Sequence, residues 1–253
     1  MSLSQEEKLE YVALLEESER RAEGKRLYSL YPDEGPLRRE LYPKHLDFFR
    51  QGRRHRERCM MAANRVGKTW GVGGYELALH LTGLYPEWWD GIRFEHPIDA
   101  WAVGETLELT RDVSQLALFG DVTNLGSGLI PRDCLMGKPS LRTGKPGAID
   151  SIKIRHTTGN ASFLQFKSYD QKRESFQGTA KHVIWMDEEP PIEIYMECLA
   201  RTMTTNGVML CTFTPLLGLS DVALLFLPEL APKGEYDPVG GAANEHKLPN
   251  WQS

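Results

Sequence analysis

The segment 60–69 constrains the fold of this 253-residue chain more than any other. It reads Met60-Met61-Ala62-Ala63-Asn64-Arg65-Val66-Gly67-Lys68-Thr69, which fits G-x-x-x-x-G-K-[ST] except that alanine replaces the first glycine. The apolar run 58–63 predicts a strand before the loop, and 68–81 predicts a helix after it. Backbone N–H groups in such a strand–loop–helix point inward and hold phosphate oxygens. The segment therefore predicts a P-loop at the end of a strand.

Each residue of this loop has an expected role. Gly67 lets the backbone pass close to a β-phosphate, Lys68 reaches the β and γ oxygens, and the Thr69 hydroxyl is a ligand of Mg²⁺. The other residues expected to line the nucleotide are Ala62, Ala63, Asn64, Arg65 and Val66. The alternative is a chance strand–turn–helix with a lone lysine. Ala62 weakens the match, because the first position often needs glycine dihedrals.

Strand and helix patterns alternate along the chain. Strands are predicted at 98–103, 151–155, 162–167, 182–186 and 208–213, and helices at 4–24, 44–51, 106–119 and 192–203. The two strands 151–155 and 162–167 are expected to form a hairpin. Strands separated by helices predict an α/β fold, with a mostly parallel sheet and helices on both of its faces.

Other stretches are expected to be irregular or to divide the chain. Residues 120–148 are rich in Gly, Pro and basic residues and predict an irregular excursion. We expect a helical N-terminal segment at 1–55, a core at 56–231 and a mobile tail at 232–253. The core-facing residues predicted for the helix 106–119 are Leu107, Leu109, Val113, Leu116 and Leu118.

A second motif follows the apolar run His182-Val183-Ile184-Trp185-Met186, which ends in Asp187-Glu188-Glu189. A buried strand that ends in Asp-Glu is a Walker B pattern, and it delivers its acids to the sheet edge where the loop also lies. Asp187 would then hold Mg²⁺, and Glu188 would act as general base on the attacking water. The alternative is a solvated start of a helix before Pro190-Pro191. Two motifs in this order predict hydrolysis of ATP or GTP.

Composition excludes several classes. With 30 Lys+Arg against 35 Asp+Glu, the net charge of −5 is unlike that of a protein that coats nucleic acid. The sequence contains no run of about 18 apolar residues, so it predicts no membrane-spanning helix. The four cysteines, Cys59, Cys134, Cys198 and Cys211, lack metal-ligand spacing and predict reduced thiols in an intracellular protein.

These motifs, with Cys211-Thr212-Phe213-Thr214-Pro215 on the next strand, resemble the large terminase subunit of tailed bacteriophages over most of residues 40–220. The resemblance implies that Arg65 contacts the γ-phosphate and that Thr212 and Thr214 couple hydrolysis to movement. It also implies that Tyr42 contacts adenine, although Tyr42 could instead pack against Phe48 or Phe49.

The resemblance further implies an ATP- and Mg²⁺-dependent motor that moves double-stranded DNA into a procapsid. Its partners would be a portal protein, a small terminase subunit and copies of itself in a ring, in the cytoplasm of the host cell. The nuclease domain of the family is expected to be absent, because only about 40 residues follow the coupling motif. There are two alternatives. One is a helicase or recombination-type ATPase, and the other is a nucleotide-gated assembly module with little turnover.

Basic residues outside the motifs have open roles. Where the family often has an arginine before the Asp-Glu pair, this chain has Gln177, so Arg173 is the candidate for a cation that acts across a subunit interface; it could equally be a solvated charge. Arg142 and Lys145, in the basic stretch 132–155, are candidates for DNA contact, with a solubilising surface or a subunit interface as alternatives. The cluster Arg50–Arg58 favours structural or intersubunit roles.

Overall fold

The computed structural model describes residues 26–216, 218 and 220–227, together with Gln5 and Tyr11. Its centre is a seven-stranded sheet with the order β1-β7-β6-β2-β5-β4-β3. The first five strands in this order are parallel, and β4 is antiparallel to both β5 and β3. The strands are β1 (Glu57–Met61), β2 (Asp99–Gly104), β3 (Leu135–Leu141), β4 (Ile149–Arg155), β5 (Ala161–Ser168), β6 (Val183–Asp187) and β7 (Val208–Phe213).

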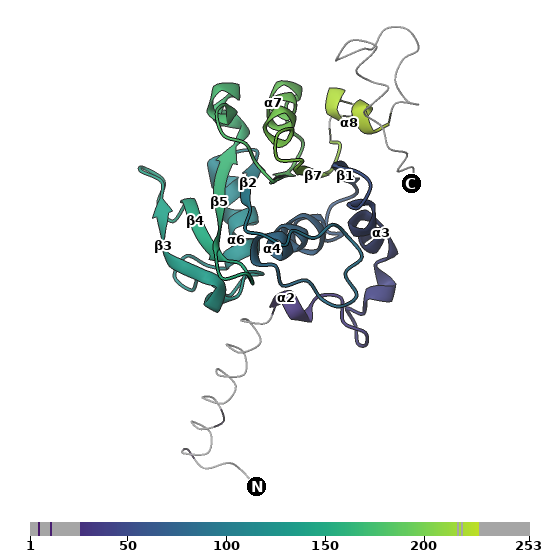
Figure 1. Cartoon of the computed structure of the whole chain (residues 1–253), viewed down its shortest axis with the longest axis vertical. Coiled ribbons are helices and arrows are strands. Elements are labelled where there is room, and N and C mark those ends of the chain that lie inside the picture. Colours follow the sequence, from purple (N-terminus) through teal and green to yellow (C-terminus); the bar gives the residue numbers. More distant parts are fainter. Residues whose placement is uncertain (1–4, 6–10, 12–25, 217, 219, 228–253) are drawn as a thin grey trace.

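Helices cover both faces of the sheet, as the sequence predicted. Figure 1 shows α4 (Gly74–Thr82) and α6 (Leu116–Phe119) on one side, and α7 (Ile192–Thr202) and α8 (Asp221–Phe226) on the other. Each side has its own apolar core, one around Leu77, Ala102 and Trp185 and the other around Trp101, Met186 and Cys198. The mostly parallel α/β fold is therefore confirmed.

The N-terminal elements pack on the α4 side of the sheet (Figure 1). They are α2 (Arg26–Ser29), the 3₁₀ turn η1 (Arg39–Leu41) and α3 (Pro43–Gln51), which confirms the helix predicted at 44–51. Leu27, Phe48 and Phe49 belong to the same apolar core as α4. The predicted helix 4–24 and tail 232–253 lie outside the described residues. No described helix is long and apolar enough to cross a membrane.

The helix after the loop starts with a wide turn. Residues Lys68–Gly73 form the π-helical segment η2, which continues directly into α4. This start lies so close to β6 that a Cβ atom at Gly73 would come within 2.0 Å of the Trp185 indole nitrogen. Glycine at position 73 therefore lets the loop approach the strand that carries the acidic motif.

Two expectations were wrong. The stretch 120–148 is not wholly irregular, because the turn η4 (Arg132–Cys134) leads into β3. Gly137 and Pro139 hide this strand in the sequence; both are tolerated because β3 is an edge strand with a bulge.

The second error concerns the core face predicted for the helix 106–119. The helix itself is observed over 107–119, as α5 (Leu107–Leu109), the π-helical segment η3 (Thr110–Gln115) and α6. Three residues expected in the core are exposed instead, namely Leu109, Val113 and Leu116. The wider π turn shifts the phase of the helix, so that polar residues face inward. Thr110, Ser114 and Gln115 are buried at 1–3% exposure, and each has a hydrogen-bond partner.

Candidate functional site

The two sequence motifs meet at the carboxyl edge of the central strands. The loop follows β1, the acidic motif ends β6, and β7 lies between these two strands. The Thr69 hydroxyl donates to Oδ1 of Asp187 over 3.0 Å. A hydroxyl and a carboxylate at this distance can be ligands of the same cation.

The loop itself is open and partly left-handed. Residues 63–67 are exposed, and Arg65 and Gly67 have positive φ angles of 65° and 87°. Ala62 is not among the residues with positive φ. The first position of this loop therefore needs no glycine, which explains why alanine fits there.

Lys68 is buried and fully hydrogen-bonded within the chain. Its ammonium donates to the carbonyl oxygens of Ala62 and Ala63 over 3.0 and 2.8 Å, and to the Thr214 hydroxyl over 2.7 Å. Thr214 is also within 2.9 Å of Oδ1 of Asn64. Thr214, after the end of β7, thus contacts the loop directly, as expected of a residue in a coupling motif.

Asp187 is buried among hydroxyl groups and has no cationic partner among the described residues. Its carboxylate accepts from Thr69 and Thr212, each at 3.0 Å, and from Ser114 at 3.3 Å. Burial raises the pKa of Asp187 to about 6, although these hydroxyls lower it. The carboxylate is therefore an incompletely compensated negative charge.

Thr212 lies behind Asp187, away from solvent. It is completely buried, donates to Asp187, and accepts from the Trp185 indole N–H over 2.8 Å. The two predicted coupling residues thus contact different groups: Thr214 contacts Lys68, and Thr212 orients the acidic side chain.

Glu188 follows in a strained backbone conformation, with φ at 76°. Its N–H donates to the Thr212 carbonyl, and its own carbonyl accepts from the Tyr169 hydroxyl over 2.8 Å. Partial burial raises the pKa of the Glu188 carboxyl; the Lys68 ammonium opposes this shift. The side chain lines a cavity of about 610 Å³, the lining of which includes Glu105, Glu189, Pro191, Thr214, Leu216 and Asp221.

Tyr42 packs against the apolar core on the α4 side, which also contains Phe48 and Phe49. Its ring stacks on His45 with centroids 5.3 Å apart, and it contacts Tyr31 edge-on. The Tyr31 hydroxyl in turn donates to the carbonyl of Gly71 in η2 over 2.6 Å. This half-buried ring is therefore attached to the start of the helix after the loop.

Three predicted candidates are held by their own chain. Arg173 donates to Glu197 over 3.0 Å, Arg142 contacts Asp150 at 3.0 Å, and Lys145 pairs with Glu108. No described hydrogen bond or ion pair joins any of them to the loop or to the acidic motif. For the Arg50–Arg58 cluster, a structural role is favoured over an intersubunit role, because Arg58 is completely buried against Glu76.

Sequence reasoning missed three residues whose side chains support the acidic motif and Thr212, namely Ser114, Trp185 and Tyr169. Trp185 lies inside the recognised apolar run, and Tyr169 lies in a turn. The sequence around these two residues gives no indication of their hydrogen bonds. The only available signal for Ser114 was that it is a polar residue in a predicted apolar helix.

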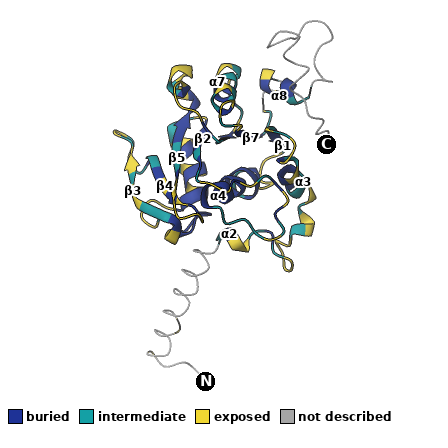
Figure 2. Cartoon of the chain, in the orientation of Figure 1, coloured by how far each residue is buried: buried dark blue, intermediate teal, exposed yellow. Residues whose placement is uncertain are grey.

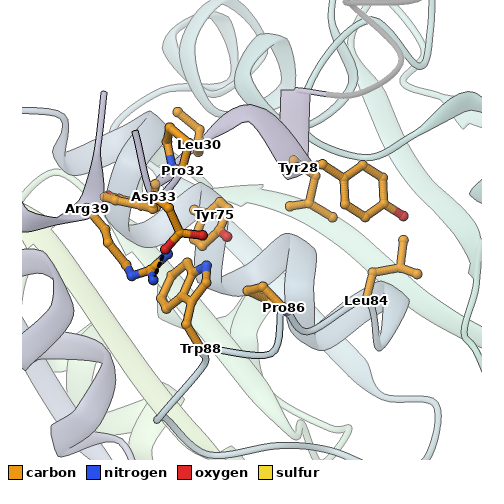
Figure 3. Close-up of a pocket in the computed structure, with 11 residues that line it drawn as sticks. Tyr28, Leu30, Pro32, Asp33, Arg39, Tyr75, Leu84, Pro86 and Trp88 are labelled. Atoms are coloured by element: carbon orange, nitrogen blue, oxygen red, sulfur yellow. Dashed lines mark hydrogen bonds and ion pairs between the residues drawn. The ribbon is translucent and has the colours of Figure 1, made fainter. Parts of the chain in front are cut away.

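A second pocket, of about 310 Å³, is lined in part by residues of α2 (Figure 3). Tyr28, Tyr75 and Trp88 give it aromatic walls, and its charged lining residues Asp33 and Arg39 pair with each other. This pocket therefore lacks the unpaired reactive groups that the sheet edge carries.

Comparison with known proteins places these features in context. Residues 59–237 match a family model described as terminase large subunit, T4likevirus-type, N-terminal. The chain is 36% identical over 247 residues to the terminase large subunit of Salmonella phage P22, a match that covers 89% of this chain and 47% of that protein. The chain thus spans about half the length of this curated relative.

Two solved structures are also similar. The large terminase of the thermophilic bacteriophage D6E in complex with ADP matches with 13% identity and a TM-score of 0.48, over 82% of this chain and 42% of that chain. The large terminase ATPase domain of Thermus phage P74-26 matches with 14% identity and a TM-score of 0.45, over 73% of this chain and 68% of that chain.

Proposed function

The chain belongs to the family of terminase large subunits of the T4likevirus type, and on that premise we propose that it is an ATP-hydrolysing motor domain for packaging viral DNA. The observation that carries the proposal is the 3.0 Å contact between the Thr69 hydroxyl and the Asp187 carboxylate. It joins residues that are 118 positions apart in the chain, one in a phosphate-binding loop and one at the end of an acidic strand.

The residues present fit Mg²⁺. Asp187 is 4% exposed, and its raised pKa reflects a buried charge that a cation would compensate. No group of three or more His, Cys, Asp or Glu in the described part of the chain could hold a metal, so a hydroxyl, a carboxylate and phosphate oxygens would be the ligands. Bound there, Mg²⁺ would neutralise charge on the β and γ phosphates.

In our proposal the loop residues bind and orient the triphosphate. The exposed N–H groups of residues 63–67 face the phosphates, and the Lys68 ammonium turns from its carbonyl partners toward the β and γ oxygens. Arg65 is exposed in the loop, where its guanidinium can follow the γ-phosphate. The adenine would lie against Tyr42.

Glu188 would take the proton of the attacking water. Its raised pKa makes it a stronger base than an ordinary glutamate, and it lines the open cavity from which water reaches the site. The hydrogen bonds to its backbone N–H and carbonyl hold the strained conformation that aims the side chain.

Thr214 supplies a route from chemistry to movement. It accepts from Lys68 over 2.7 Å, and this bond is lost when the ammonium turns to phosphate. We propose that this exchange moves the segment after β7, with Thr212 keeping Asp187 in place. Arg173 could act across a subunit interface only after leaving Glu197.

The partners in this proposal are double-stranded DNA, a portal protein, a small terminase subunit and further copies of the chain in a ring. The site of action is the cytoplasm of the host cell. A motor of this kind should hydrolyse ATP without separating the strands of a duplex, which distinguishes it from a helicase.

The test is calorimetric titration of the protein with a non-hydrolysable ATP analogue and Mg²⁺, followed by measurement of phosphate release. Lys68→Ala should abolish tight binding, and Glu188→Gln should keep binding but lose turnover. Arg54→Ala, which removes an exposed cation elsewhere, is the matched control. Wild-type affinity in Lys68→Ala would refute the assignment of the loop; unchanged turnover in Glu188→Gln would refute the assignment of the base.

A further inference from the structure

The segment α5–η3–α6 is hydrogen-bonded to the acidic residue of the candidate magnesium site. Ser114 in η3 is 1% exposed and donates to Oδ2 of Asp187 over 3.3 Å. Thr69 and Thr212 bind Oδ1 of the same carboxylate. Ser114 thus joins this segment to the second oxygen of the Asp187 carboxylate.

The neighbouring residue contacts a different element. The Gln115 side chain donates to the Gly147 carbonyl over 2.9 Å and accepts from the Ile149 N–H over 2.8 Å. Arg111 donates to the Pro146 carbonyl over 3.1 Å, and Glu108 pairs with Lys145. The connection between β3 and β4 is therefore held to this segment at several points.

The hairpin β3–β4 forms one border of the sheet, away from α7 (Figure 1), and β3 is largely exposed (Figure 2). On β4, Ile152 and Ile154 point into the core on the α4 side. Because side chains alternate along a strand, Lys153 and Arg155 point to the opposite face, and both are exposed. Their sheet partners on that face are Met136, Phe163 and Ala161.

This face carries positive charge that no described ion pair compensates. Among the described ion pairs, Asp150 is taken by Arg142 and Glu108 by Lys145, whereas none involves Lys153 or Arg155. Lys138 on the neighbouring strand β3 is also exposed and takes part in no described ion pair. Exposed cations on two neighbouring strands suit a partner with regularly spaced negative charges.

We propose that the exposed face of the β3–β4 hairpin binds the phosphate backbone of duplex DNA, and that the segment α5–η3–α6 links this contact to the nucleotide site. The inference rests on the proposed function, since it takes duplex DNA as the substrate. Ser114 and Gln115, which are adjacent in the chain, contact Asp187 and the hairpin respectively. A shift of the hairpin on DNA therefore reaches the magnesium ligand through one rigid segment.

The binding test uses the whole chain and a short fluorescent duplex of arbitrary sequence. The variant Lys153→Gln/Arg155→Gln should bind more weakly, and the slope of log K against log salt should fall by roughly 2, at about 0.9 per phosphate contact. Arg50→Gln/Arg53→Gln, which removes two exposed cations from α3 and the turn after it, is the matched control and should bind like wild type.

The outcomes separate this inference from the proposed function. A wild-type chain that binds no duplex contradicts both. Wild-type binding with an unchanged slope in Lys153→Gln/Arg155→Gln overturns only the hairpin assignment. If that variant keeps duplex binding but loses binding of poly-glutamate, the face serves an acidic protein and the DNA assignment is overturned.

The linkage test measures the affinity for a non-hydrolysable ATP analogue with Mg²⁺, with and without saturating duplex. Wild type should change affinity by about fivefold or more, as coupled sites typically do. Gln115→Ala should keep duplex affinity but lose this change. Arg111→Gln, which alters an exposed contact to the same connection, should reduce the change even if Gln115→Ala does not fold. An affinity that is independent of DNA in wild type, or full linkage in both variants, overturns the coupling.

Discussion

Two buried carboxylates, one on the helix that follows the loop and one beside the start of that helix, differ in how their charge is balanced. Glu76 on α4 is completely buried and lies 2.6 Å from the Arg58 guanidinium, with His80 as a second partner. Asp187 is 4% exposed, and its partners among the described residues are hydroxyl groups. Both carboxylates are shielded from solvent, but in the described part of the chain only Glu76 has a cation beside it.

The pKa values of the two groups move in opposite directions. Burial alone would raise the pKa of Glu76, but Arg58 and His80 outweigh burial and hold it below its usual value. Burial raises the pKa of Asp187 to about 6. Glu76 is thus neutralised within the chain, whereas Asp187 is left short of positive charge, as the proposed role in binding Mg²⁺ requires.

The Glu76 network also joins three elements. Arg58 on β1 donates to the Phe48 carbonyl of α3 over 2.7 Å, and Glu76 lies on α4. The Tyr85 hydroxyl accepts from the Phe94 N–H and lies 2.8 Å from Nδ1 of His80, and Nε2 of His80 lies 3.1 Å from Glu76. Burial lowers the pKa of His80, although the Glu76 carboxylate opposes this shift.

The largest expected effect comes from breaking the paired carboxylate. Arg58→Met leaves Glu76 buried without its cation and should lower the free energy of unfolding by about 3–5 kcal/mol. Urea denaturation followed by circular dichroism measures this. Arg58→Met/Glu76→Leu should recover most of the loss, since an apolar pair replaces the ion pair. A loss as small as that of the exposed Arg50→Gln would show that the two carboxylates do not differ in this way.

The opposite effect on the free energy of unfolding is expected when the charge of Asp187 is removed. Asp187→Asn removes an uncompensated charge and should stabilise the nucleotide-free protein at pH 7 by roughly 1–3 kcal/mol, the scale set by the shift from about 3.9 to about 6. Thermal unfolding without Mg²⁺ measures the gain. The same variant should lose Mg²⁺-dependent nucleotide binding.

The pH dependence of this gain follows from the raised pKa of Asp187. Between about pH 4 and about pH 6 the folded state binds more protons than the unfolded state, so wild-type stability from this group falls as pH rises. The advantage of Asp187→Asn should therefore be near zero at pH 4 and complete above pH 6. A constant advantage across this range would contradict the charge explanation.

His80 should give a pH slope of the opposite sign. Its folded-state pKa is lowered, so below the unfolded value of about 6.5 the unfolded state binds more protons and stability falls as pH falls. His80→Gln should make the acid side of the stability profile shallower, by at most about 1.4 kcal/mol per pH unit. Denaturation midpoints of both proteins from pH 8 downward measure this slope. Identical slopes would mean that His80 is not kept neutral.

Much of this arrangement could be predicted from the sequence because it depends on local chemistry. The loop at 60–69 and the run that ends at Asp187 carry their residue types in order, and parallel strands bring their carboxyl ends to one edge. The family resemblance inferred from these motifs and from Thr212 and Thr214 is confirmed by the family match over residues 59–237.

What could not be predicted depends on packing between distant segments. Apolar spacing suggested that Leu109, Val113 and Leu116 face the core, but the π turn η3 rotates Ser114 and Gln115 inward instead. Similarly, the basic stretch 132–155 marked Arg142 and Lys145 as candidates for DNA contact, whereas nearby acids pair with both. Phase shifts and ion pairs of this kind do not follow from periodicity or net charge.

The smallest expected effect comes from the hydroxyl that orients Asp187. Thr212→Val keeps the shape but leaves the Trp185 N–H without its acceptor, so stability should fall by about 1 kcal/mol. Thr212→Ser, which keeps the hydroxyl, should behave like wild type. Because Thr212 also donates to Oδ1 of Asp187, Thr212→Val should weaken Mg²⁺–nucleotide binding severalfold in calorimetry, whereas binding without Mg²⁺ stays the same. Equal weakening with and without Mg²⁺ would assign Thr212 to the general packing of β7 rather than to the orientation of the carboxylate.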